Sequence, residues 1–206
     1  MIMEVSVNQY LLDTKFAAEE LIKLIVFEEN QLADLIKSFE EKKKHAEFLH
    51  QDFMAKHLDP YGDFPEGQEM HAYVLFSKYN ETVLQPLERE IESLRKSMAN
   101  KRYSICALSG SLLQIAKQGI SSVHGSLKDC YDGRQIRNDV LKNVIWQGRN
   151  QSMHFEEGDY NKALVVCFNN LGYATVPTQN MAKEVIDVLG WTGYQEYEAD
   201  MSSILP

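Results

Sequence analysis

The feature that most constrains the fold is a run of apolar residues that recurs every seven positions near the start of the chain. The first row consists of Ile25, Leu32, Phe39, Ala46 and Phe53, and the companion row of Leu21, Leu35 and Leu49. Such a heptad pattern predicts a long helix that buries one side. Glu28 and Lys42 interrupt the rows, which favours a packed antiparallel hairpin over a free coiled coil. We therefore expect a helix over residues 14–58, with Thr14 as its N-cap.

A second helical arm follows a cluster of helix breakers. Residues 59–67 contain two prolines and two glycines, which predict a turn. Residues 68–99 then place apolar side chains at intervals of three and four, as one face of a helix does. Pro86 predicts either a kink in this arm or the first turn of a new helix. The two arms together predict a long helical hairpin. Residues 1–12 are compatible with a short strand or an irregular arm.

The middle of the chain also has a helical pattern. Residues 101–123 predict a further helix, in which small side chains around Gly110 would let a neighbouring helix approach closely. A polar loop is expected over residues 124–133. The next helix is expected to start after Asp132 or Gly133 and to lead into the polar segment that begins at Trp146.

Two shorter helices are expected near the end, at residues 161–171 and 178–189. The second is expected to be capped by Thr178 and to end at Gly190. Residues 165–168 would also suit a buried strand, but no other run could pair with them. The tail after residue 190 has no clear period. We predict an all-α protein with an N-terminal helical hairpin, residues 1–98, packed on a helical bundle of four to five helices and its tail, residues 99–206.

Charge is distributed unevenly along the chain. The net charge of −9 argues against nucleic-acid binding by the protein as a whole. Residues 101–150, however, carry eight Lys and Arg against three Asp and Glu, a balance of +5. An acidic protein can therefore still present one local phosphate-binding surface.

No apolar run approaches the roughly 20 residues that a membrane span needs, no secretory signal is evident, and three widely spaced cysteines suit reduced thiols. We expect a soluble, cytoplasmic protein with no membrane contact.

Common catalytic and cofactor motifs are absent from the sequence. It contains no G-x-x-x-x-G-K-[ST] phosphate loop and no G-x-S-x-G elbow, so kinases and classical serine hydrolases are disfavoured. Glu47 and His50 form a Glu-x-x-His pair of the kind used in di-iron bundles, but His71 lacks the matching Glu because residue 68 is Gln. A solvated helix face is the favoured interpretation of this pair, and a metal-dependent site is the weaker alternative. No cofactor is expected.

The segment from Trp146 to Gly158 carries the strongest candidate chemistry, as the pattern Trp-x-x-Arg-Asn-x-x-x-His-Phe-Glu-Glu-Gly. RNA can be cut without metal when the ribose 2′-hydroxyl attacks the adjacent phosphate. That reaction needs an acid or base titrating near neutrality and a fixed cation beside the phosphate. His154 and Arg149 supply these groups, and Asn150 lies four residues before His154, on the same helix face. Five residues turn a helix by about 140°, so Arg149 and His154 need a second surface to complete a site, as a two-fold dimer would provide.

This motif, together with the helical segments before it, resembles the HEPN superfamily (higher eukaryotes and prokaryotes nucleotide-binding domain). The resemblance covers roughly residues 99–190. It implies a helical bundle that often dimerises with its motifs facing each other, and a metal-independent ribonuclease that acts as a toxin or in antiviral defence. It further implies that His154 takes part in acid/base chemistry or positions the substrate, that Arg149 binds phosphate and that Asn150 assists. RNA is the expected partner, and a separate antitoxin or nucleotidyltransferase is compatible with the resemblance.

The alternative function is a non-catalytic helical module that binds a nucleotide or a partner protein. The long amphipathic hairpin over residues 14–99 favours it, because an exposed helix face is a ready partner surface. The two functions differ in where the candidate residues should lie. An active enzyme needs Arg149 and His154 open to substrate, whereas a scaffold would bury His154 or pair Arg149 with Glu156 or Glu157.

Overall fold

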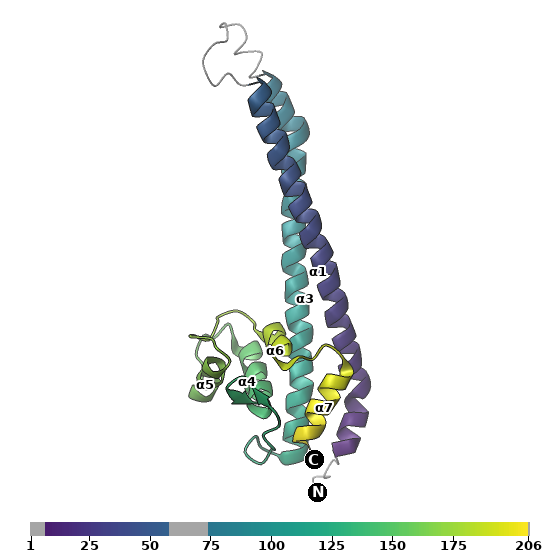
Figure 1. The fold of residues 1–206 in the computed structure, drawn as a ribbon, viewed down its shortest axis with the longest axis vertical. Coiled ribbons are helices and arrows are strands. Elements are labelled where there is room, and N and C mark those ends of the chain that lie inside the picture. The colour runs from purple at the N-terminus through teal and green to yellow at the C-terminus, as the bar shows by residue number, and fades with distance from the viewer. Residues whose placement is uncertain (1–6, 58–73, 206) are drawn as a thin grey trace. The chain divides into compact units, whose positions relative to one another are not determined.

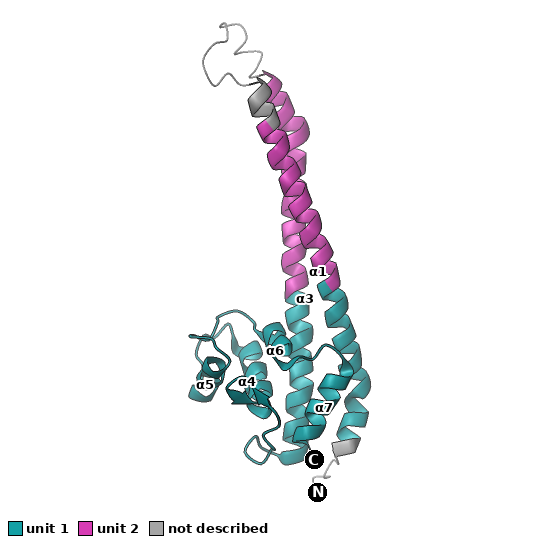
Figure 2. Cartoon of the chain, viewed as in Figure 1, with its two compact units in different colours: residues 1–29, 103–206 teal, residues 30–102 magenta. Residues whose placement is uncertain are grey.

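The computed structural model describes residues 7–57 and 74–205, and within them the protein is helical, as predicted. The helices are α1 (Val7–His57), α3 (Gln85–His124), α4 (Leu141–His154), α5 (Lys162–Asn170), α6 (Ala182–Leu189) and α7 (Tyr194–Ile204), with residues 74–79 helical and a π-helical turn η1 (Asn80–Leu84) before α3. The chain forms two compact units, residues 30–102 and residues 1–29 with 103–206 (Figure 2).

The unit formed by residues 30–102 contains two helical arms that run antiparallel. Lys42 Nζ pairs with Glu90 Oε2 at 2.5 Å, and the Arg95 guanidinium lies 5.8 Å from the centre of the Phe39 ring. Phe39 comes before Lys42 in the first arm, but its partner Arg95 comes after Glu90 in the second arm. The two arms therefore run antiparallel, which confirms the predicted hairpin geometry. The heptad residues that the structure describes in this unit are all partly shielded from solvent, namely Leu32, Leu35, Phe39, Ala46 and Leu49. The predicted turn at residues 59–67 lies outside the described residues.

Pro86 explains a local irregularity in the second arm. Proline has no N–H to donate, and its ring clashes with the carbonyl one helical turn earlier. In the structure the helix widens just before it, because the Gln85 N–H bonds to the Asn80 carbonyl five residues back. Pro86 then occupies the first turn of α3, which confirms one of its two predicted roles.

Three predicted helix boundaries were wrong. α1 begins by Val7, and Thr14 is no cap, because its hydroxyl donates to the Tyr10 carbonyl at 2.8 Å inside the helix. α3 continues through residues 99–101, where one helix was predicted to end and another to start. No proline or glycine lies between Pro86 and Gly110, so nothing in that stretch stops the backbone hydrogen bonding.

In the unit formed by residues 1–29 and 103–206, α1 and α3 approach closely at one glycine. A side-chain carbon built on Gly119 would lie 2.7 Å from the Tyr10 ring, so only glycine leaves room for it. The Tyr10 hydroxyl donates to the Ile115 carbonyl at 2.6 Å, and burial raises the pKa of Tyr10 to about 12. Gly110, predicted to allow close helix approach, faces Ser152 of α4, with 3.6 Å between Ser152 Oγ and the position that a side-chain carbon would take.

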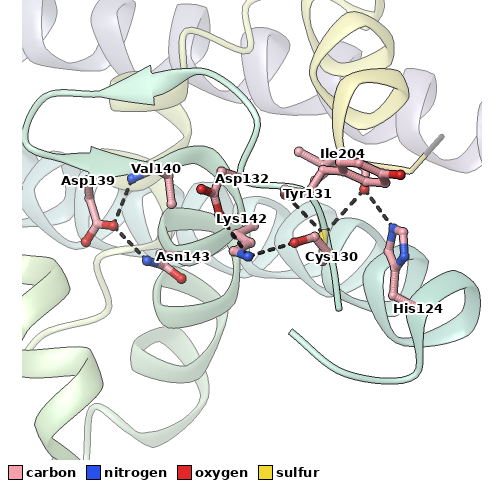
Figure 3. A network of polar contacts seen from close by, with 9 residues as sticks. All are labelled: His124, Cys130, Tyr131, Asp132, Asp139, Val140, Lys142, Asn143 and Ile204. Carbon is pink, nitrogen blue, oxygen red and sulfur yellow. Dashed lines mark hydrogen bonds and ion pairs between the residues drawn. The ribbon is translucent and has the colours of Figure 1, made fainter. Parts of the chain in front are cut away.

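A small β-hairpin, absent from the prediction, precedes α4. β1 (Gln135–Ile136) pairs antiparallel with β2 (Asp139–Val140), and the helix predicted to start after Asp132 or Gly133 begins at Leu141 instead. Asp139 holds the junction. Its Oδ1 accepts from the Val140 N–H at 2.8 Å and from Asn143 Nδ2 at 2.9 Å (Figure 3). Burial alone would raise the pKa of Asp139, but these hydrogen bonds outweigh it and leave the pKa below its usual range.

Figure 3 also shows how the loop before this hairpin is attached. Lys142 Nζ donates to the Cys130 carbonyl at 2.7 Å and pairs with Asp132 at 2.9 Å. His124 Nε2 and Cys130 Sγ both contact the Ile204 carbonyl, at 2.8 and 3.3 Å. The start of α4 and the end of α7 are therefore tied to the same short loop.

α5 and α6 both pack on α4, which lies between them (Figure 1). Residues 165–168 are helical, so the alternative strand is excluded. α6 starts at Ala182, and the Asn180 side chain accepts from the Ala182 N–H at 2.9 Å in place of the predicted Thr178 cap. Gly190 ends α6 with a left-handed φ of 70°, as predicted.

The C-terminal tail is helical, contrary to its apparent lack of period. Within α7, Tyr197, Met201 and Ile204 are buried at intervals of four and three. Asp200 on the same helix is 6% exposed and accepts from Arg134 Nε at 2.7 Å, forming an ion pair with it. Trp191 Nε1 donates to the same carboxylate at 2.8 Å. No helix within residues 7–57 and 74–205 combines the length and the apolar character that crossing a membrane requires.

Candidate active site

The three predicted site residues all lie on the last turns of α4, which is packed on several sides. α4 contacts α5, α6, α7 and the β-hairpin. Gly148 allows its closest approach to α6, because a side-chain carbon there would lie 2.6 Å from Val185 Cγ1. The helix that carries the candidate residues is thus fixed on several sides by the fold.

Arg149 is oriented by neutral groups. Its Nε donates to Gln114 Oε1 on α3 at 2.5 Å, and its Nη1 lies 3.4 Å from Asn150 Oδ1. Arg149 forms no ion pair within the described part of the chain, so neither Glu156 nor Glu157 neutralises it there. A guanidinium held by amide oxygens keeps its full charge and retains further N–H donors for an anion.

His154 lies at the surface at the end of α4. Its side chain is 50% exposed, and its Nδ1 lies 2.8 Å from Glu157 Oε1. An ionised carboxylate can only accept, so Nδ1 is the donor in this contact. In the neutral ring the lone pair is then on Nε2, which has no hydrogen-bond partner among the described residues. This arrangement presents a proton acceptor to solvent.

Asn150 contacts the arginine instead of the histidine. Its Oδ1 faces Arg149, and its Nδ2 lies 3.4 Å from Gln147 Oε1. The shared helix face of Asn150 and His154 would suit Asn150 to orient either a phosphate or, by direct contact, the imidazole. In the structure Glu157 makes that contact, three residues beyond the histidine.

Arg149 and His154 are on one helix but are not joined. Within the described residues no hydrogen bond connects them, in keeping with the rotation of about 140° between positions five apart. The structure therefore brings Arg149 together with Gln114 and Asn150, and His154 together with Glu157, as two separate groups.

The residue that fixes this part of α4 was not among the predicted site residues. Gln151 is fully buried, and its Nε2 donates to the carbonyls of Pro177 at 3.1 Å and Gln179 at 2.7 Å. Its Oε1 accepts from the Met181 N–H at 2.9 Å. One side chain next to Asn150 thus holds the segment that leads into α6. The only signal in the sequence was a long polar residue at a position where the helical period calls for a buried one.

The candidate metal pair, Glu47 and His50, is not part of a larger cluster of metal-binding side chains among the described residues. Glu47 lies 3.9 Å from Lys43 in a surface ion pair. Across the residues that the structure describes, no group of three or more His, Cys, Asp and Glu side chains is arranged to hold a metal ion.

The three thiols are all unpaired cysteines, of which Cys130 and Cys167 are buried. Burial raises the pKa of Cys130 to about 11, and burial with the nearby Asp139 raises that of Cys167 further. Neither thiol is suited to act as a nucleophile.

No family model, curated protein or solved structure matches the chain.

Proposed function

We propose that the protein is a metal-independent endoribonuclease of the HEPN type. The observation that carries this proposal is the state of Arg149, whose guanidinium is aimed by the amide oxygens of Gln114 and Asn150 and has no carboxylate partner among the described residues. A fixed, unneutralised cation is what stabilisation of charge on a phosphorane needs. The half-exposed His154 imidazole, five residues further along α4, supplies the acid/base group.

In the proposed reaction, His154 Nε2 takes the proton of a ribose 2′-hydroxyl, and the resulting oxygen attacks the adjacent phosphorus. The bond from phosphorus to the 5′-oxygen breaks, and that oxygen takes up a proton. The products are a 2′,3′-cyclic phosphate and a 5′-hydroxyl. Arg149 binds the non-bridging oxygens through its remaining N–H groups while negative charge grows on them. Asn150 assists by holding the guanidinium.

We further propose that the working unit is a homodimer. Arg149 and His154 are too far apart in rotation to share one narrow face of α4. A two-fold axis would place two arginines and two histidines around one cleft, and the second histidine would donate the proton that the leaving 5′-oxygen needs.

The central test is RNA cleavage in the presence of a chelator. Wild-type protein is expected to leave cyclic-phosphate ends with excess EDTA present, while His154→Ala and Arg149→Ala lose cleavage and keep their helical circular dichroism. The matched controls are His45→Ala and Arg102→Ala, both at exposed positions of the unit formed by residues 30–102, which does not include α4. Cleavage that persists in both site variants, or is lost equally in the controls, contradicts the proposal.

The dimer can be tested by mixing inactive variants. If each site draws on both protomers, then Arg149→Ala mixed with His154→Ala forms some heterodimers that carry one intact arginine and one intact histidine at a shared cleft. Partial recovery of cleavage is expected. A monomer by sedimentation at working concentration, with no recovery, contradicts the shared site.

The biological role that we propose is that of a cytoplasmic toxin or phage-defence component, with an antitoxin or nucleotidyltransferase as a separate protein. Expression of wild type, but not of His154→Ala, is then expected to arrest bacterial growth. Arrest by both forms at equal levels contradicts a role for cleavage.

A non-catalytic module is favoured by one specific observation. Glu156, Glu157 and Asp159 are exposed directly after His154 and place negative charge beside it. Such a cluster opposes RNA approach. RNA or nucleotide binding without any cleavage, unchanged in His154→Ala, would support this alternative.

A further inference from the structure

Two contacts between α3 and α4 lie side by side on the surface that includes Arg149. Gln114 on α3 contacts Arg149, and three residues further along α3 the Lys117 Nζ lies 4.4 Å from the centre of the Trp146 ring, three residues earlier on α4. Three residues advance a helix by about 4.5 Å. That spacing is of the same order as the rise of about 3.4 Å per nucleotide along one strand of a duplex.

Trp146 differs from the other tryptophan in its environment. Trp191 is 3% exposed and donates its N–H to Asp200, so it is a core residue. Trp146 is partly exposed, as is Lys117, and both belong to the basic segment of the chain. Within the described residues Lys117 has no carboxylate partner, and the ring of Trp146 is the contact that the structure gives its ammonium.

We propose that Trp146 and Lys117 form a nucleotide subsite beside Arg149, in which the Trp146 ring stacks on an unpaired RNA base and Lys117 binds the phosphate next to that base. This inference rests on the proposed ribonuclease function and names its substrate as single-stranded RNA. Trp146 and Lys117 would bind the substrate away from the reacting phosphate and take no part in the bond changes.

The free protein is arranged for an exchange of partners. Without RNA, the ammonium of Lys117 covers the Trp146 ring through a cation–π contact. At an exposed site this contact is weaker than the stacking of a base on the same ring. A base that stacks on the ring displaces the ammonium, and a neighbouring phosphate is then within reach of the released Lys117 side chain. Stacking tolerates every base, so the subsite would select single strands over duplexes and not a particular sequence.

The test uses the intrinsic fluorescence of the full chain and a non-cleavable probe, a 2′-O-methyl oligoribonucleotide of mixed sequence. Trp146 is the solvent-accessible fluorophore and Trp191 the buried one. Binding of the probe is expected to quench the iodide-accessible part of the emission and to leave the protected part unchanged. The same oligonucleotide annealed to its complement is expected to quench far less.

Variants separate the base contact from the phosphate contact. In anisotropy titrations with labelled probe, Trp146→Leu is expected to weaken binding roughly 5- to 150-fold, the range for loss of one base–aromatic stack, and Trp146→Phe is expected to restore most of it. Lys117→Ala is expected to reduce the slope of log K against log salt concentration by about 0.7, the value for one phosphate contact on a single strand. Trp146→Leu should keep the wild-type slope. Lys128→Ala, at an exposed position of the same basic segment, is the matched control.

The outcomes distinguish this inference from the proposed function. Quenching of Trp146 without any RNA cleavage supports the subsite and contradicts the ribonuclease. Cleavage with an unchanged KM in Trp146→Leu supports the ribonuclease and overturns the subsite. An unquenched Trp146 in wild type at saturating probe overturns the subsite without recourse to any variant, so a folding defect in Trp146→Leu cannot hide the answer.

Discussion

Replacing Gln151 by leucine tests whether the candidate site depends on a buried polar hub. Leucine has a similar size and suits an apolar interior, so packing should change little. The variant removes three hydrogen bonds, from Nε2 to the carbonyls of Pro177 and Gln179 and from the Met181 N–H to Oε1. These backbone groups would lose a partner at a site where the glutamine is fully buried.

The expected cost follows from those contacts. A hydrogen bond contributes about 1 kcal/mol net, and a buried group left unsatisfied costs about 1–3 kcal/mol. Some of the three backbone groups will reach water as the segment before α6 loosens. We therefore expect Gln151→Leu to lower the free energy of unfolding by about 3 kcal/mol. With a urea slope of about 1–3 kcal/mol/M, the midpoint falls by about 1–3 M.

Urea unfolding followed by tryptophan fluorescence measures this change, because Trp146 and Trp191 both belong to the unit that contains α4. Gln118→Leu, the same replacement at an exposed position of α3, is the matched control. Equal midpoints for Gln151→Leu and Gln118→Leu would show that these three hydrogen bonds do not stabilise the fold.

A second variant at the same position sharpens the test. Gln151→Glu keeps an acceptor for Met181 but turns a carboxylate toward two carbonyl oxygens. Burial and these oxygens would raise the folded-state pKa of the new carboxyl above its unfolded value. A raised folded pKa means stability that is present at low pH and lost as pH rises. Gln151→Glu should thus be closest to wild type in acid and weakest near pH 8, whereas the deficit of Gln151→Leu should vary little with pH.

Three further predictions concern the surrounding framework. Asp200→Ala should lower the free energy of unfolding by about 3 kcal/mol, because it leaves the buried Trp191 N–H without an acceptor and breaks a charged hydrogen-bond pair. Asp187→Ala removes only a surface ion pair and should cost less than about 1 kcal/mol in the same urea assay. Because hydrogen bonding lowers the folded pKa of Asp139 below 3.8, its contribution is present above that pH and lost as pH falls, so Asp139→Asn should show a flatter decline of unfolding free energy between about pH 5 and pH 3 than wild type. Buried thiols with raised pKa values should leave Cys130 and Cys167 unreactive toward a disulfide reagent at pH 8 until urea is added, and rapid labelling of both in native protein would contradict their burial.

The parts of the fold that the sequence predicted are those governed by local periodicity. Three features depend on residues close in sequence: the heptad rows of the N-terminal arm, the apolar face of residues 68–99, and the left-handed Gly190 that ends α6. The αL stop and the antiparallel arms were confirmed. α7 was missed although Tyr197, Met201 and Ile204 have helical spacing, because the glycine and aromatic residues just before them obscured the period.

The errors occurred where distant residues decide the local structure. The hairpin before α4 is two residues per strand, too short for any alternation to show, and it is held by Asp139, whose partners include Asn170 of α5 at 3.1 Å. No residue close to Asp139 in the sequence predicts its contact with Asn170, which lies 31 positions away. The same applies to Gln151, whose three partners lie between residues 177 and 181.

The candidate site shows the same division between local and distant information. The spacing of Arg149, Asn150 and His154 was readable in the sequence, and so was the rotation that separates the arginine from the histidine. The residue of α3 that orients Arg149 was not, because Gln114 is 35 positions from Arg149.

That long-range contact changes the chemical argument. An arginine aimed by a glutamine from α3 keeps its charge, whereas the surface spacing alone allowed a neutralising pair with Glu156 or Glu157. Glu157 contacts His154 instead and leaves Nε2 as the open nitrogen. The two halves of the proposed chemistry are therefore each prepared by a different neighbour, one on α3 and one after α4. Because no contact in the described chain joins these halves, a phosphate that bridges Arg149 and a histidine is what would unite them, and the variant-mixing experiment determines whether that histidine comes from the same protomer.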